Sequence, residues 1–109
     1  MAFDWEDFRS GVLDGLKSLA EQTVGGAIAQ ATKDTEAFLL ETRAKIERWT
    51  KALAEGELDR DEFELLVKAR MTNMKMHALR SAGVLQNATE RFRQGLISLV
   101  IDKAFDLVA

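Results

Sequence analysis

The sequence predicts an all-α protein, built as an antiparallel bundle of about four helices with short connections. Proline is absent, while strong helix formers such as Ala, Leu, Glu, Lys and Arg dominate. Apolar residues recur at helical spacing through most of the chain. A helix stop and a helix start follow one another near the middle of the chain, between Trp49 and Phe63.

That central stretch predicts an antiparallel helical hairpin. Gly56 suits the left-handed conformation that ends many helices. Asp59 can cap the next helix, and Glu62 stands three residues later, where it completes a capping box. Leu58 and Phe63 occupy the two positions of a hydrophobic staple, which fixes the direction in which the chain enters the helix.

The first helix is expected over residues 4–24, where Phe3, Asp4 and Phe8 repeat the same staple and cap. Its end is left open by the pair Gly25–Gly26, which costs about 2 kcal/mol in a helix interior relative to alanine. Either the helix stops in this region, or one long helix runs from Asp4 to Ala54. The second case would pair a long N-terminal helix with a helical hairpin inside an oligomer.

Two further helices are expected over residues 34–54 and 60–82. The first of them carries an apolar stripe that includes Leu39, Ile46 and Leu53. After the second, we expect a break or kink between Gly83 and Asn87, because Asn87 followed by Glu90 offers another cap and box. One bent helix would also fit, since the apolar phase continues into the last segment.

The last helix, over residues 88–107, is the most apolar. A helix that is apolar over most of its circumference is buried on several sides, so it forms either the centre of the bundle or a subunit interface. We expect self-association as a symmetric homodimer. The candidate interface residues are Leu96, Leu99, Val100 and Phe105.

Composition sets the remaining bounds. The 109 residues suit a single helical domain over residues 1–109. Apolar residues at 47% and charged residues at 30% are ordinary for a globular protein. The acidic N-terminus and the absence of an apolar run of about 20 residues predict a cytoplasmic protein with no transmembrane segment. We expect no membrane-surface role, because the polar face of the first helix is acidic.

The sequence offers no catalytic, metal or cofactor site, and we expect no enzyme. Cysteine is absent, and His77 is the sole histidine. Met74 stands three residues before it, where a di-iron Glu-x-x-His motif would need glutamate. The carboxylates lie at expected caps and solvent-facing positions, which capping and solubility explain.

Charge is segregated along the chain. Residues 66–95 contain six basic residues and one acidic residue, whereas residues 51–65 contain two basic and six acidic residues. Arg70, Asn73, His77 and Arg80 would form one stripe on a continuous third helix. The candidate partner-binding face comprises Arg70, Arg80, Arg91 and Arg93. These patterns favour a non-catalytic helical interaction or assembly module that binds itself and another protein.

Residues 82–93 support an alternative function. The segment from Ala82 to Phe92 resembles the turn and recognition helix of helix-turn-helix proteins, with Gly83 at the turn. The resemblance implies DNA binding through Gln86, Asn87 and Arg91. It departs from the family at Leu79, where a small residue is usual, and at Thr89, where an aliphatic residue packs. We expect no nucleic-acid partner, because a net charge of −3 lacks the usual basic footprint.

Overall fold

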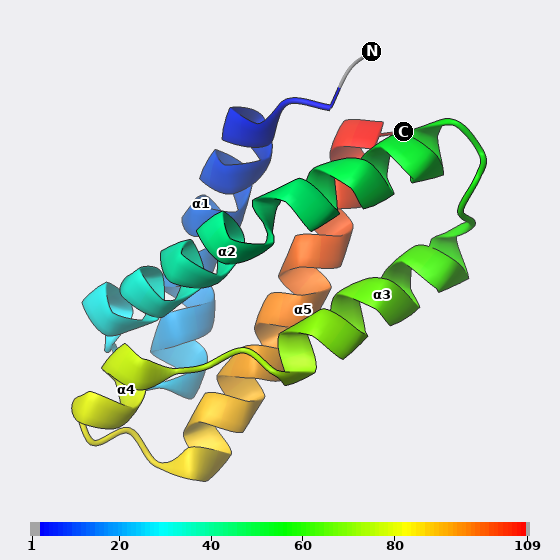
Figure 1. Ribbon diagram of the computed structural model, residues 1–109. Coiled ribbons are helices and arrows are strands. Elements are labelled where there is room, and N and C mark those ends of the chain that lie inside the picture. Colours follow the sequence, from blue (N-terminus) through cyan, green and yellow to red (C-terminus); the bar gives the residue numbers. More distant parts are fainter. Residues whose placement is uncertain (1–2, 109) are drawn as a thin grey trace.

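The computed structural model describes residues 3–108, which form an antiparallel bundle of helices without any strand. Four long helices are joined by short connections, and a fifth, short helix lies between the third and the last (Figure 1). The helices are α1 (Trp5–Thr23), α2 (Ile28–Ala54), α3 (Arg60–Thr72), α4 (His77–Ser81) and α5 (Gln86–Val108). The all-α prediction is therefore confirmed.

The two predicted helix starts have the expected caps. The Asp4 carboxylate accepts hydrogen bonds from the Glu6 and Asp7 backbone N–H groups at 2.9 and 3.2 Å. At α3, Asp59 accepts from the Glu62 N–H at 2.7 Å, while the Glu62 carboxylate accepts from the Asp59 N–H at 3.0 Å, which completes the capping box. Short-range pairing of this kind satisfies N–H groups that a helix leaves free.

The alternative prediction, one long helix from Asp4 to Ala54, is wrong. The chain turns at Gly25 and Gly26, whose φ angles of 62° and 88° are ones that side chains other than glycine rarely adopt. The next helix begins at Ile28, six residues before the expected start at Asp34, and no side chain caps it. Asp34 itself therefore lies inside α2.

Helix α3 ends ten residues earlier than expected, at Thr72. Met74 and Met76 are both buried, whereas Lys75 between them is exposed. Residues two apart point to the same side of an extended backbone but to different sides of a helix, so burying both methionines requires the helix to break.

The expected break after Gly83 is confirmed. Helix α4 ends at Ser81, Gly83 has a φ of 83°, and α5 begins at Gln86. Asn87 is therefore not a cap, because it already lies within the first turn of α5.

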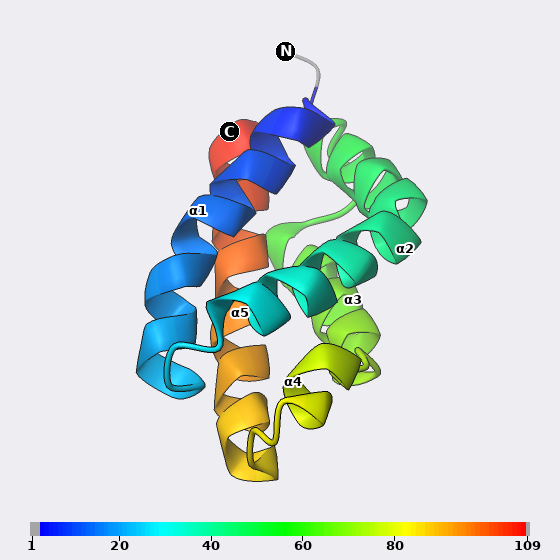
Figure 2. The same ribbon diagram turned by 90° about the vertical axis from the view of Figure 1, so that its left-hand side faces the viewer.

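The most apolar helix, α5, is the centre of the bundle, with α1 along one side and α3 along another (Figure 2). Glycines allow α1 and α5 to approach closely. A Cβ atom built on Gly15 would lie 2.7 Å from a Leu99 methyl carbon, and one on Gly95 would overlap a Leu19 methyl carbon. We call this alternation of glycine and leucine the α1–α5 seam.

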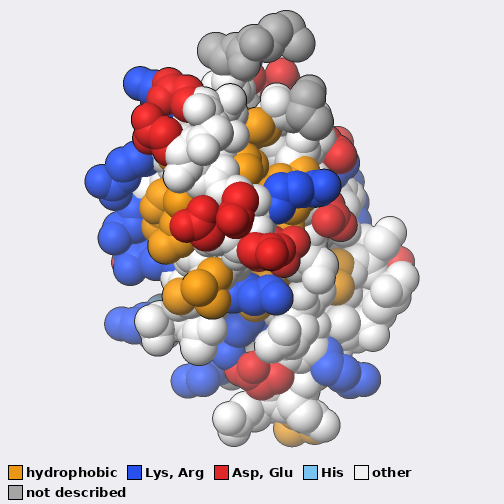
Figure 3. All heavy atoms as spheres, turned by 90° about the vertical axis from the view of Figure 1, so that its right-hand side faces the viewer, with side chains coloured by type: hydrophobic (Ala, Val, Ile, Leu, Met, Phe, Trp, Pro, Cys, Tyr) orange, Lys and Arg blue, Asp and Glu red, His pale blue; other side chains and the backbone are white. Residues whose placement is uncertain are grey.

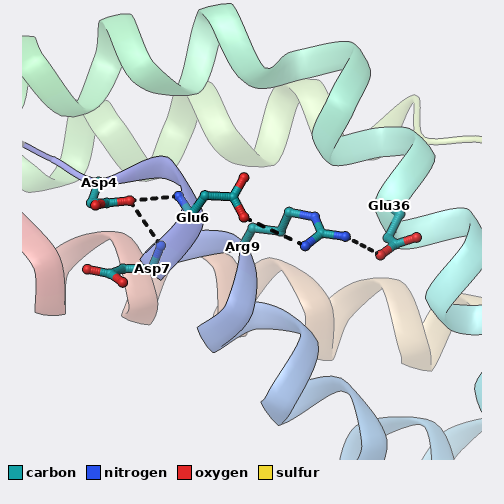
Figure 4. A network of polar contacts seen from close by, with 5 residues as sticks. All are labelled: Asp4, Glu6, Asp7, Arg9 and Glu36. Carbon is teal, nitrogen blue, oxygen red and sulfur yellow. Dashed lines mark hydrogen bonds and ion pairs between the residues drawn. The ribbon is translucent and has the colours of Figure 1, made fainter.

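An ion pair on the surface links α1 to α2. The Arg9 guanidinium lies 2.6 Å from the Glu36 carboxylate and 3.9 Å from that of Glu6 (Figure 4). All three side chains are substantially exposed, so solvent weakens this contribution. Packing of apolar faces, including α1 on α5, is the larger source of stability.

Candidate interaction surfaces

The four apolar residues expected at a subunit interface make contacts within their own chain. Leu96 and Val100 are buried among the core side chains, and Leu99 packs against Gly15 of α1. Phe105 lies against Phe63 of α3, with 5.5 Å between the ring centroids. Of these four side chains, Phe105 also lines a cavity that opens at the surface.

Most of the apolar surface of α5 is therefore covered by other helices of the same chain, chiefly α1 and α3. A wholly apolar circumference indicates burial, but it does not say whether the covering helix comes from the same chain. Gly11 and Gly15 of α1, which stand four residues apart, face Lys103 and Leu99 of α5 and permit the close approach of these two helices. Self-association stays a prediction. Its interface would have to lie on an exposed surface of the bundle.

The bundle is open at the end where α2 finishes and α3 begins. A cavity of about 330 Å³ is lined by Leu53, Ala54, Arg60, Phe105 and Val108. A second cavity, of about 510 Å³, shares Ala54 and Val108 and extends toward Phe3 and Thr50. We call this pair of cavities the open end. The sequence placed Leu53 on an apolar helix stripe and Phe105 at a subunit interface, because a helical stripe does not reveal where a bundle stops closing.

Charged side chains surround the open end. The Arg60 guanidinium lies 4.2 Å from the centroid of the Phe105 ring, a distance that allows a cation–π contact. Glu47, Lys51 and Glu55 line the second cavity. On the face shown in Figure 3, hydrophobic side chains reach the surface among acidic and basic ones. Apolar contact area with a charged rim is typical of surfaces that bind proteins.

The four candidate arginines do not form one face. The break after Thr72 separates Arg70 on α3 from Arg80 on α4, so the predicted stripe through Asn73 and His77 does not exist. Arg80 and Arg91 are exposed, whereas the Arg93 side chain is only 12% exposed. Arg93 pairs with Glu90 and donates a hydrogen bond to the Met74 carbonyl oxygen at 2.8 Å. Arg93 therefore stabilises the segment between α3 and α4.

Asp34 is a buried carboxylate, and no sequence pattern marks it as a functional residue. Its two oxygens accept hydrogen bonds from the Ala78 and Leu79 backbone N–H groups, both at 2.9 Å. Helix α4 is thus capped from α2, by a residue 44 positions away from Ala78. Both oxygens are occupied, which gives this carboxylate a structural role.

A shallow groove of about 630 Å³ lies between α2 and α4, beside Asp34 and the exposed His77. Most of its lining is alanine and serine. No cluster of three or more histidine or carboxylate side chains suited to a metal ion occurs within residues 3–108.

A turn at Gly83 separates α4 from α5, at the place where the helix-turn-helix resemblance expects one. Gln86, Asn87 and Arg91 are exposed on the first turns of α5. Thr89 is buried, and its hydroxyl donates a hydrogen bond to the Gln86 carbonyl oxygen at 2.7 Å. Helix α4, however, has only five residues.

No described helix combines the length and apolarity needed to cross a membrane. No protein family model matches the chain, and no curated protein or solved structure shows significant similarity to it.

Proposed function

We propose that the protein is a non-catalytic helical interaction module that binds other proteins at its open end. One observation carries this proposal: Leu53, Phe105 and Val108 are only partly buried and line adjoining cavities at the surface. A complete core would have covered these side chains, since exposing them costs about 25 cal/mol for each Å² of apolar area.

The chemistry of the open end favours a protein partner. Its apolar lining suits an aliphatic or aromatic side chain, and such anchors provide much of the affinity in protein complexes. The rim carries both signs of charge, through Glu47 and Glu55 on one hand and Lys51 and Arg60 on the other. A mixed rim fits the polar border of a protein interface better than a surface for a polyanion.

A capture experiment tests this proposal. The purified chain and its Val108→Asp variant would be used to capture proteins from cells that express the protein. Val108 lies at the end of α5, so the new carboxylate places charge in both cavities with little effect on the core. We expect the variant to lose at least 90% of specifically bound protein, an effect on the order of 1.4 kcal/mol or more.

The matched control is Leu85→Asp, which makes the same chemical change at a leucine that is 72% exposed in the turn before α5. It should retain the bound proteins. Circular dichroism and thermal unfolding would verify that both variants fold. Equal capture by the wild type and Val108→Asp would refute a role for the open end.

DNA binding is the second candidate, because Gln86, Asn87 and Arg91 are exposed after a well-formed turn. The first helix of this unit is short, and the net charge of −3 opposes a polyanion. We expect duplex DNA to bind no better than about micromolar at low salt. A tighter complex that weakens with salt, and that Arg91→Ala weakens without unfolding the chain, would favour DNA instead.

A further inference from the structure

The outward side of α3 presents a second exposed surface, and none of its residues lines the cavities of the open end. It is centred on Leu65, whose side chain is 69% exposed. Residues three and four positions away share a helix face, so four neighbours surround Leu65. We call this set the α3 face, and all of its members are exposed: Asp61, Glu62, Leu65, Lys68 and Ala69.

Charge on the α3 face changes sign at Leu65. Asp61 and Glu62 lie one turn before it, and Lys68 lies one turn after it. Among residues 3–108, neither Asp61 nor Lys68 takes part in an ion pair. The Glu62 carboxylate accepts a hydrogen bond from the Asp59 N–H, and Glu62 is exposed.

The charge pattern of the α3 face is complementary to that of a second α3 helix that runs in the opposite direction. If two α3 helices pack antiparallel about a two-fold axis at Leu65, the two leucines meet at the centre. Asp61 and Glu62 of each chain then face Lys68 of the other, so the contact contains two equivalent sets of opposite charges. A parallel arrangement would instead place acids against acids, which is unfavourable.

We propose that the α3 face binds a second copy of this chain in an antiparallel, two-fold symmetric dimer. The inference deepens the proposed role as an interaction module by naming one partner and the surface that it uses. A two-fold interface needs one surface complementary to itself, and the sign change at Leu65 supplies that property. Because the contact is small, we expect a dissociation constant on the order of 100 μM.

Charge-reversal variants test the geometry by sedimentation across a concentration series that reaches about 1 mM, well above the expected dissociation constant. Lys68→Glu places an acid against Asp61 and Glu62 twice in each dimer, so we expect association to weaken by at least about tenfold. Asp61→Lys places a lysine against Lys68 and should also weaken it.

An equimolar mixture of these two variants is the decisive measurement. In a mixed dimer, the glutamate introduced by Lys68→Glu faces the lysine introduced by Asp61→Lys, while the original acids of the first variant face the original Lys68 of the second. We expect the mixed dimer to form at least about tenfold more strongly than either variant alone. Leu65→Ser should weaken the wild-type dimer, and the exposed Lys17→Glu on α1 is the matched control that should not.

A chain that stays monomeric throughout the series overturns the proposal. So does a dimer that Lys68→Glu and Leu65→Ser leave unchanged, since it would use another surface. Circular dichroism would verify that every variant is helical. Capture at the open end is measured with Val108→Asp, so failure of the dimer and failure of the proposed function give different results.

Discussion

At the scale of single residues, Asp34 joins two segments of the chain that are far apart in sequence. Asp34→Ala removes the acceptor for the Ala78 and Leu79 N–H groups. We expect a loss of about 2–4 kcal/mol in the free energy of unfolding, because both donors are at least partly buried. Asp34→Asn keeps one acceptor oxygen and should lose about 1–2 kcal/mol. Denaturant unfolding measures both, and equal stability of Asp34→Ala and the wild type would contradict this role.

Arg91 and Arg93 provide a matched pair, because they are close in sequence but differ in environment. Arg93→Ala removes the donor to the Met74 carbonyl and leaves Glu90 unpaired, so we expect a loss of about 2 kcal/mol in unfolding free energy. Arg91 is exposed, and Arg91→Ala should change the unfolding free energy by less than about 0.5 kcal/mol. Thermal or denaturant unfolding under one set of conditions compares them, and similar losses would show that the Met74 contact is unimportant.

At the scale of helices, the α1–α5 seam predicts a change of sign in a double-mutant cycle. Gly95→Ala alone should destabilise the protein by about 1 kcal/mol, because the new methyl group overlaps the Leu19 side chain. In a Leu19→Ala background that space is free. There the same substitution should stabilise the protein by up to about 1 kcal/mol, since alanine favours helix over glycine.

Chemical denaturation of the four proteins in this cycle measures the coupling between the two positions. Ser98→Ala, at an exposed position of α5, is the control for the effect of alanine alone. Additive effects of Gly95→Ala and Leu19→Ala would show that the two residues do not pack together.

The helix ends show how much of the fold the sequence predicts. The caps at Asp4 and Asp59 were predicted because each cap bond joins residues two or three positions apart. The break after Thr72 was not predicted, because neither glycine nor proline marks it. The residues that stabilise the segment after the break are distant in the sequence. Arg93 binds the Met74 carbonyl from 19 positions away, and Asp34 caps α4 from 44 away. Of the residues that line the open end, only Phe105 was predicted to contact a partner, since helical periodicity does not locate the edge of a core.

At the scale of the whole molecule, the bundle measures 43 × 23 × 21 Å along its principal axes, with a Cα radius of gyration of 13.7 Å. Small-angle scattering from dilute monomer should give a radius of gyration only slightly larger, because side chains and hydration add little. The long N-terminal helix would have given a length of about 75 Å at 1.5 Å per residue. A monomer of that length in solution would contradict the compact bundle.

The cavity shared by Phe3 and Val108 means that the first and last described residues lie close together. The α1–α5 seam therefore joins the first and last helices of the chain, and its residue pairs lie 84 and 76 positions apart, so a long loop must close before it forms. A circular permutant that links these ends through a short glycine-rich linker and opens the chain at Gly56 would turn α5 and α1 into consecutive helices. Its seam would become a local contact, and local contacts form faster, so the permutant should refold more rapidly than the natural order at similar stability.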